Sequence, residues 1–144
     1  LPGTLKITRE ALARCGEPAR RIALKPADYR RARLGDSAYD LILLSHITHD
    51  EGPEVNRGLV ERSFRALRPG GRVVIHDFMV DADRTAPLFG ALFSVHMLAY
   101  TEAGRTYTAE EYRTWLEDAG LTVESRHPIS RGSSNASEII IARK

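Results

Sequence analysis

The sequence is poor in cysteine and in long apolar runs, and each shortage excludes a class of protein. Cys15 is the only cysteine, so no disulfide framework can form. We expect a cytoplasmic protein in which this thiol is buried on the apolar side of a helix. The longest mostly apolar run covers residues 87–100, which is shorter than the roughly 20 residues needed to cross a bilayer. No membrane partner is therefore expected.

Charge of one sign is not concentrated in any segment either. The net charge is +2, and the arginines are scattered along the chain, whereas nucleic-acid binding usually needs a clustered basic face. We therefore expect no nucleic-acid partner. The remaining composition, 42% hydrophobic and 28% charged over 144 residues, is that of one globular domain at most.

The first half of the chain alternates between helical and strand character. Residues 4–15 have helical apolar spacing, and residues 21–25 alternate as a strand does. Residues 40–45 and 72–78 are continuous apolar runs, typical of parallel strands buried on both faces. Residues 53–67 begin with proline and glutamate and end before a Pro-Gly-Gly sequence, which predicts a helix crossing between these two strands.

The second half adds two helices and two strands. Residues 87–100 predict a buried or interface helix, and Thr108 with Glu111 forms a capping-box pattern that begins a helix to about Ala119. The last two strands are expected at residues 121–127 and 138–142, with a loop between them at residues 131–137. This order of elements predicts an α/β fold, a Rossmann-like doubly wound sheet that is mostly parallel and ends in an antiparallel strand pair.

Ionisable side chains gather after the two apolar strands, where ligands bind in open α/β sheets. They are His46, His49, Asp50, Glu51, His76 and Asp77, and the hydroxyl of Ser45 lies beside them. His49 is the expected general base because imidazole titrates near neutral pH, and Asp77 could fix its tautomer.

Three candidate positions have two interpretations each. His46 could be a site residue or a hydrogen-bonded wall residue, and His76 could pack against the adjacent helix. Asp28 could contact a cofactor, or it could be a turn carboxylate that bonds the backbone nearby.

The motifs AYDLILLSHITHDEG (38–52) and LRPGGRVVIHDF (67–78) resemble the core of small-molecule S-adenosylmethionine-dependent O-methyltransferases of the plant phenolic and bacterial polyketide type. The resemblance extends over nearly the whole chain, through LPGTLKITREALARCG, PADYRR and AGRTYTAEEYRTWLEDAGL. It implies S-adenosylmethionine as cofactor and a hydroxylated small molecule as methyl acceptor.

The resemblance also implies roles for individual residues. His49 matches the general base and Asp77 an acid that flanks it, while Asp28, Tyr29 and Ser45 match cofactor-binding positions. The expected acceptor-binding residues are His46, Asp50, His96 and Met97. Two positions depart from the family pattern: Glu51 stands where plant members usually have tryptophan, and Thr106 replaces a second flanking acid.

Upstream features of the family are not found in the sequence. They are a glycine-rich loop after the first strand and an N-terminal helical dimerisation domain. We therefore expect residues 1–144 to be the C-terminal part of a catalytic domain, with the first strands of the sheet missing and an exposed apolar edge. The full-length protein is expected to be a homodimer.

Methyl transfer by this family is expected to need no metal. Two other functions remain open beside it. One is a metal-dependent enzyme that uses His46, His49 and Asp77 or Asp50 as ligands, although no accepted hydrolase spacing is present. The other is a binding module or a relative that keeps the cofactor without transferring a methyl group.

Overall fold

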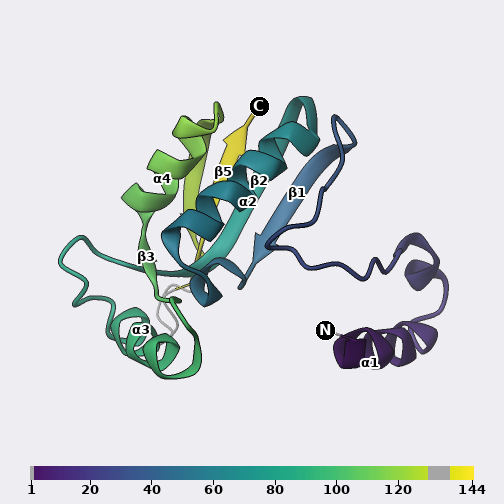
Figure 1. The fold of residues 1–144 in the computed structure, drawn as a ribbon, viewed down its shortest axis with the longest axis horizontal. Helices are drawn as coiled ribbons and strands as arrows, with labels where there is room; N and C mark the ends of the chain where they lie inside the picture. The colour runs from purple at the N-terminus through teal and green to yellow at the C-terminus, as the bar shows by residue number, and fades with distance from the viewer. Residues whose placement is uncertain (1, 130–136) are drawn as a thin grey trace. The chain divides into compact units, whose positions relative to one another are not determined.

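The computed structural model of the chain describes residues 2–129 and 137–144. The chain divides into two compact units, Leu1–Ala32 and Arg33–Lys144. The second unit contains the sheet and the α-helices that follow α1 in the described residues (Figure 1).

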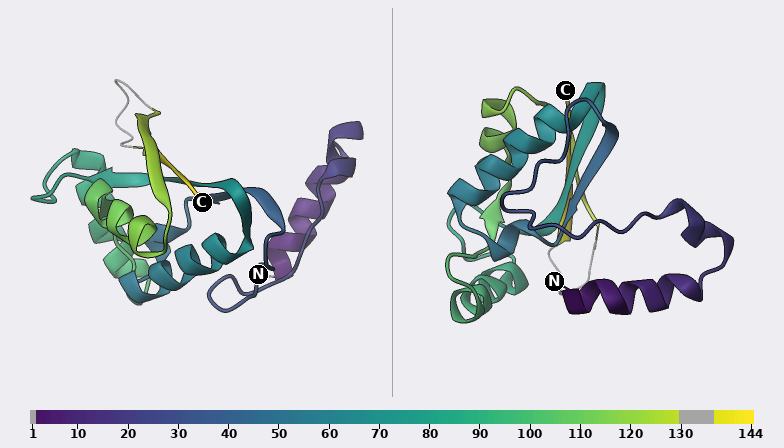
Figure 2. Two further views of the ribbon diagram at one scale, coloured as in Figure 1. Left: turned by 90° about the horizontal axis from the view of Figure 1, so that it is seen from above. Right: turned by 45° about the vertical axis from the view of Figure 1, so that its right-hand side comes forward.

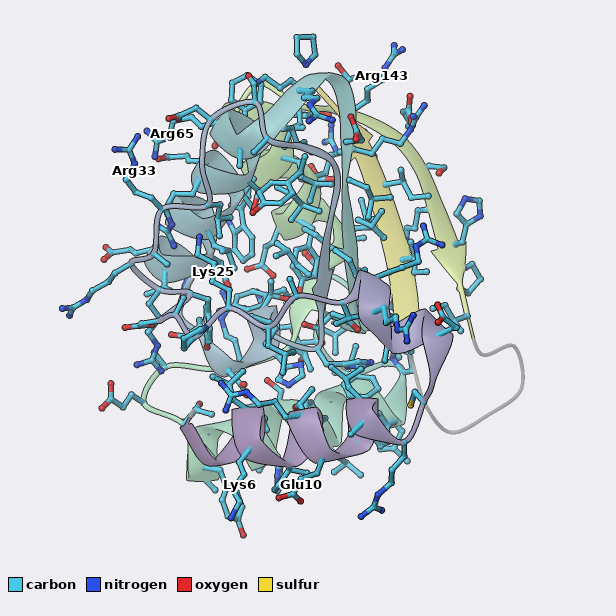
Figure 3. All side chains as sticks on the ribbon, turned by 90° about the vertical axis from the view of Figure 1, so that its right-hand side faces the viewer. Lys6, Glu10, Lys25, Arg33, Arg65 and Arg143 are labelled. Atoms are coloured by element: carbon cyan, nitrogen blue, oxygen red, sulfur yellow. The ribbon has the colours of Figure 1, made fainter. Side chains whose placement is uncertain are left out.

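The first unit consists of helix α1 (Pro2–Ala13) and a 3-10 turn, η1 (Glu17–Arg21). The helix confirms the prediction for residues 4–15 with a shift of two residues. Lys6 and Glu10, four residues apart, project from the same side of α1 (Figure 3).

Two predictions for the first unit are wrong. Cys15 is exposed because α1 ends at Ala13, so its thiol, which donates to the carbonyl of Ala11 at 3.3 Å, has no helix face to be buried in. Residues 21–25 are not a strand: Arg21 ends η1, and no strand pairing among the described residues includes this segment. The alternating pattern was that of a strand, but a strand forms only where another strand accepts its hydrogen bonds.

The second unit is built on a sheet in the order β1, β2, β5, β4. The bounds are β1 Tyr39–Ser45, β2 Leu67–Val80, β4 Thr122–Pro128 and β5 Ser137–Arg143. Strands β1 and β2 are parallel, whereas β5 runs antiparallel to both β2 and β4. The predicted parallel pair and the predicted antiparallel C-terminal pair are thus confirmed.

Helices α2 (Pro53–Ala66) and α4 (Ala109–Asp118) cover one side of this sheet (Figure 2). The capping box is confirmed, since Glu111 N donates to Thr108 Oγ1 at 3.1 Å and Thr108 N donates to the Glu111 carboxylate at 2.9 Å. Side chains at most 3% exposed form the core between sheet and helices: Leu59, Val60, Val73, Ile75, Met79, Tyr112, Trp115 and Leu116.

Strand β2 begins earlier than predicted and runs through the Pro-Gly-Gly sequence. Its register against β1 shifts between Tyr39 and Leu41, whose partners are Leu67 and Arg72. Gly70 has φ of 78°, a left-handed conformation that costs glycine little. The residues between Leu67 and Arg72 are therefore accommodated as an irregularity at the start of the strand.

The remaining elements are α3 (Leu88–Tyr100), which confirms the predicted helix 87–100, and the short β3 (Tyr107–Thr108), which pairs with the end of β2. Most of the predicted loop 131–137 lies outside the described residues, and Ser137 already belongs to β5. Among the described residues, every helix is too short or too polar to cross a membrane.

Candidate active site

The candidate site is built where β1 ends and the chain turns into η2 (Thr48–Asp50). His46 adopts φ of 51° at this turn, and its N–H donates to the carbonyl of His76 at 2.9 Å. The side-chain amide of Asn56, on α2, donates to the carbonyls of Thr48 and Glu51. These bonds fix the turn against the sheet on one side and against α2 on the other.

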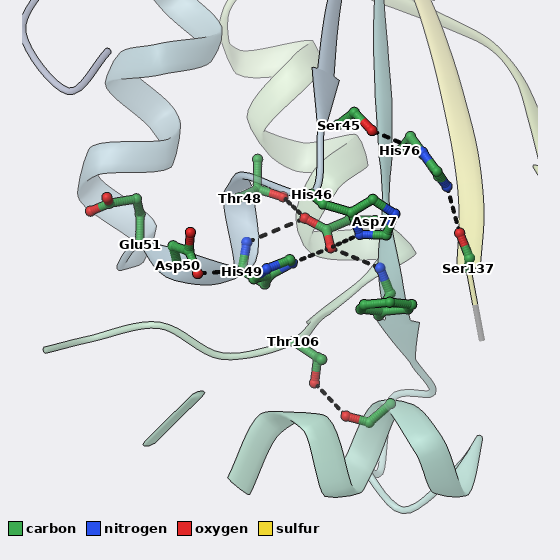
Figure 4. A network of polar contacts seen from close by, with 12 residues as sticks. Ser45, His46, Thr48, His49, Asp50, Glu51, His76, Asp77, Thr106 and Ser137 are labelled. Atoms are coloured by element: carbon green, nitrogen blue, oxygen red, sulfur yellow. Dashed lines mark hydrogen bonds and ion pairs between the residues drawn. The ribbon is translucent and has the colours of Figure 1, made fainter. Parts of the chain in front are cut away.

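Asp77, near the end of β2, is the centre of the polar network (Figure 4). Its carboxylate is completely buried and accepts four hydrogen bonds. Oδ1 accepts from His49 Nδ1 at 2.5 Å and from Phe78 N at 2.8 Å, while Oδ2 accepts from Thr48 Oγ1 at 2.5 Å and from His49 N at 3.2 Å. A carboxylate has about four lone-pair positions, so all of them are in use.

The bond to Asp77 determines the tautomer of His49. An ionised carboxylate only accepts hydrogen bonds, so Nδ1 of His49 carries the proton and Nε2 keeps its lone pair. Nε2 lies 3.6 Å from Asp50 Oδ1, which is longer than a hydrogen bond. The sequence prediction that Asp77 orients His49 agrees with this geometry, in which Nε2 is the nitrogen able to accept a proton.

The same pair shifts the pKa of both groups. Burial lowers the pKa of His49, but the hydrogen bond and the charge of Asp77, with a smaller contribution from Asp50, outweigh it, so the pKa lies above 6.5. Burial raises the pKa of Asp77, but its bonds from His49, Thr48 and Phe78 outweigh that effect and lower it. Asp77 is therefore ionised wherever His49 changes its protonation state.

Aromatic rings surround His49 on the side of α3. The ring of Phe93 meets His49 edge-on at 4.9 Å between centroids, and Phe78 lies at 6.1 Å. Phe89 packs against Phe78 at 4.9 Å. The imidazole therefore lies beside an apolar wall suited to flat, unsaturated ligands.

His46 and His76 differ from His49 in their partners. His76 Nδ1 lies 3.0 Å from Ser45 Oγ, and His76 Nε2 lies 2.6 Å from Ser137 Oγ, so hydroxyl groups occupy both nitrogens. The ring of His46 packs edge-on against His76 at 4.3 Å. Burial lowers the pKa of His46, assisted by His76 and His49 and opposed by Asp77. The sequence allows His76 to be a residue that packs against the adjacent helix, but its hydroxyl partners lie on the neighbouring strands β1 and β5.

The predicted acceptor residues are only partly brought together. Asp50 is half-buried beside His49. On α3, His96 is exposed and stacks between Phe93 and Tyr100, whereas its neighbour Met97 is buried, 6% exposed. The two neighbours therefore differ in environment, and their common role in binding an acceptor stays a prediction.

Asp28 and Tyr29 belong to the first unit, and their contact with a cofactor stays a prediction. The carboxylate of Asp28 accepts from Arg30 N at 3.0 Å, as expected for a turn carboxylate. Thr106 donates its hydroxyl to the carbonyl of Gly90 at 3.1 Å. It ties the loop before β3 to α3, which is a different task from that of a flanking acid.

Two members of the network were missed by reasoning from sequence. Thr48 donates to Asp77, and Tyr112 Oη lies 2.7 Å from Thr48 Oγ1. Thr48 stands next to His49 and could have been noticed there. Tyr112 lies 64 residues away along the chain, and its sequence pattern indicates only the buried face of an amphipathic helix.

A metal could be considered at His46, His49 and Asp77, whose ligand atoms lie within 4.8 Å of one another. Asp77, however, already accepts four hydrogen bonds, and His49 donates one of them. A metal bound by all three residues would have to replace the His49 to Asp77 bond and remove its proton. The donor set therefore suits proton transfer better than metal binding.

The fold and the site define a class: a Rossmann-like α/β protein with a carboxylate-oriented histidine at the end of its parallel strands. A family model, the O-methyltransferase domain, matches residues 1–122. The chain therefore belongs to the O-methyltransferase domain family.

Known relatives agree with this assignment. The 3-hydroxy-5-methyl-1-naphthoate 3-O-methyltransferase of Streptomyces sahachiroi is 39% identical over 122 residues, which is 85% of this chain and 34% of that protein. An O-methyltransferase family 2 protein from Planctomyces limnophilus, solved in complex with apigenin, is similar with a TM-score of 0.86 and 33% identity over 99% of this chain and 41% of that one.

A third relative was solved with the cofactor that the family uses. Human N-acetylserotonin methyltransferase in complex with S-adenosylmethionine is similar with a TM-score of 0.70 and 28% identity, covering 83% of this chain and 33% of that one. The chain spans about a third of the length of the curated relative from Streptomyces sahachiroi. The relatives named here are thus methyltransferases or members of the O-methyltransferase family.

Proposed function

We propose that this chain takes part in S-adenosylmethionine-dependent methyl transfer to a hydroxyl group of an aromatic or polyketide-like small molecule, with His49 as general base. The observation that carries the proposal is the hydrogen bond of 2.5 Å between His49 Nδ1 and the buried carboxylate of Asp77. This bond leaves Nε2 as the proton acceptor and stabilises the imidazolium that forms when the proton arrives.

S-adenosylmethionine, when bound, would supply a methyl carbon that an acceptor oxygen attacks in line, while the bond from that carbon to the positively charged sulfur breaks. His49 removes the hydroxyl proton through Nε2 and makes that oxygen a better nucleophile, while Asp77 keeps the ring in place. Since a displacement of this kind depends largely on positioning, few residues need to act chemically. Asp28 and Tyr29 suit the adenine end of the cofactor, because a carboxylate can accept from an exocyclic amino group and a phenol ring can lie against a base.

The aromatic wall supports a flat acceptor. Phe78, Phe89 and Phe93 form this wall on the side of His49 that faces α3. Relatives named for naphthoate methylation or solved with apigenin are consistent with this choice. His46, Asp50, His96 and Met97 remain the proposed acceptor contacts.

We also propose that the intact protein is a cytoplasmic homodimer. In support, α3 has large apolar side chains that are 60–79% exposed, namely Leu88, Leu92, Val95 and Leu98. Their spacing along one helix suits packing against another helix.

The test is methyl transfer by the intact protein. It is incubated with S-adenosylmethionine carrying a labelled methyl group and a panel of hydroxylated aromatic acceptors, and products are analysed for O-methylation. Cofactor affinity is titrated separately for the wild type and for Asp28→Ala, which should bind more weakly while the bound complex still reacts. Tight cofactor binding without turnover of any acceptor would favour a cofactor-retaining relative, and stoichiometric bound zinc that turnover requires would favour the metal-dependent alternative.

A further inference from the structure

Two buried hydroxyl groups connect helix α4 to the carboxylate that orients His49. Thr48 Oγ1 lies 2.5 Å from Asp77 Oδ2 and 2.7 Å from Tyr112 Oη. Thr48 is 1% exposed, and Tyr112 is completely buried. The contact therefore joins three elements, namely η2, β2 and α4, in an environment where hydrogen bonds are strong.

The direction of each bond follows from the chemistry of the groups. Ionised Asp77 can only accept, so Thr48 gives its single hydroxyl proton to Asp77 Oδ2. Thr48 Oγ1 can then only accept from Tyr112, which donates. The result is a chain of donors that runs from Tyr112 to Thr48 to Asp77, while His49 Nδ1 donates to the other carboxylate oxygen.

We propose that Thr48 and Tyr112 are positioning residues for the methyl-transfer base, acting through the carboxylate of Asp77. The proposal rests on the proposed role of His49. Each oxygen of Asp77 has its own side-chain donor, so the plane of the carboxylate is fixed from two sides. Without the hydroxyl of Thr48, Oδ2 would keep only the longer bond from His49 N, at 3.2 Å, and the carboxylate could tilt about its remaining bond to His49 Nδ1, so that the imidazole is no longer held in one orientation.

The hydroxyl of Thr48 also moderates the charge that His49 experiences. The groups that face the pair are Asp50 and His46 beside His49, and Tyr112 beside Asp77. Removing a hydrogen bond to ionised Asp77 leaves its negative charge less compensated, so it holds the proton of His49 more strongly. The pH at which His49 becomes a competent base should therefore rise.

The test compares four variants of the intact protein by single-turnover methylation across pH. Thr48→Val keeps the shape of the side chain without the hydroxyl, Thr48→Ser keeps the hydroxyl, and Tyr112→Phe removes the more distant donor. Tyr107→Phe is the matched control, because Tyr107 belongs to the same aromatic cluster, 5.8 Å from Tyr112 between ring centroids, but its hydroxyl donates to the carbonyl of Glu51.

Thr48→Val should react about tenfold more slowly at neutral pH, with the acid limb of the rate profile displaced to higher pH and cofactor affinity unchanged. Tyr112→Phe should show the same displacement with a smaller loss of about threefold. Thr48→Ser should restore the wild-type profile, and Tyr107→Phe should keep the wild-type acid limb even if its thermal stability falls as much as that of Tyr112→Phe.

Acid limbs that coincide with the wild type in both Thr48→Val and Tyr112→Phe would overturn the proposal. If Thr48→Val does not fold, the comparison of Tyr112→Phe with Tyr107→Phe decides alone, because equal profiles in these two would mean that Tyr112 is only a packing residue. The variant His49→Ala distinguishes failure of the positioning role of Thr48 and Tyr112 from failure of the proposed base itself. Loss of activity in His49→Ala with unchanged Thr48 and Tyr112 variants removes only the positioning role, whereas normal activity in His49→Ala removes the base and the positioning role together.

Discussion

The two faces of the sheet in the second unit use the same strands for different purposes. On the face covered by α2 and α4, Val73, Ile75 and Asp77 alternate along β2 and are completely buried. On the opposite face, Val74, His76 and Phe78 are only half-buried. On β1, this second face carries Leu41 and Leu43, each 56% exposed.

This difference shows where precise chemistry can be placed. Asp77 is held by four hydrogen bonds because it lies on the face that the chain itself closes, among the side chains of the core. His76, one residue earlier on the strand, points to the other face, and its hydrogen-bond partners among the described residues are serine hydroxyls. Alternation along one strand thus places a fixed carboxylate and a hydroxyl-bonded histidine side by side in sequence but on opposite faces.

The largest expected effect concerns stability. Leu59→Ala, on the covered face, should lower the free energy of unfolding by about 2–5 kcal/mol, because it removes buried contacts and leaves a cavity. Leu43→Ala, on the open face, should change it by less than about 0.5 kcal/mol in the 144-residue chain. Denaturant unfolding of both variants measures the difference. A large loss in Leu43→Ala would mean that the second face is packed in solution.

The next effect concerns the carboxylate. Asp77→Asn should lower the single-turnover rate by about ten- to a hundredfold, less than removal of the base itself. A base must be neutral to act, so the wild-type rate should rise with pH through the raised pKa of His49, above 6.5. In Asp77→Asn the effect of burial remains while only Asp50 still opposes it, so the pKa of His49 should fall. An acid limb that does not move to lower pH in this variant would contradict the role of Asp77.

The smallest effect concerns His76. His76→Asn should change the rate by no more than about threefold, since the residue faces away from Asp77 and its hydrogen-bond partners in the described part of the chain are hydroxyl groups. The same single-turnover assay measures it, with Asp77→Asn as the reference. A loss in His76→Asn as large as in Asp77→Asn would show that the two faces are not separate in function.

The strands and the helix between them could be predicted because their signals are local. The apolar runs at β1 and β2 and the proline and glutamate at the start of α2 each lie within a few residues. The strand prediction for residues 21–25 was wrong because a strand depends on a pairing partner, which a local pattern does not contain. The exposure of Cys15 was missed because it depended on the last residue of α1.

The candidate site, too, could be predicted only where its signals are local in the sequence. His49 and Asp77 could be proposed because strand ends meet at one edge of a parallel sheet and because the motifs resemble a known family. The four bonds to Asp77 and the link from Tyr112 could not be predicted, since they depend on how α4 packs on β2. Side-chain contacts between distant elements depend on tertiary packing, which no short segment of the sequence determines.

The most direct measurement of the central claim is single-turnover methylation by His49→Ala in the intact protein, alongside a cofactor titration. We predict a rate lower by about a hundred- to ten-thousandfold, since a general base acts in the transition state, with cofactor affinity nearly unchanged. Near-normal turnover would contradict it, because the acceptor would then ionise without help or His46 would be the base.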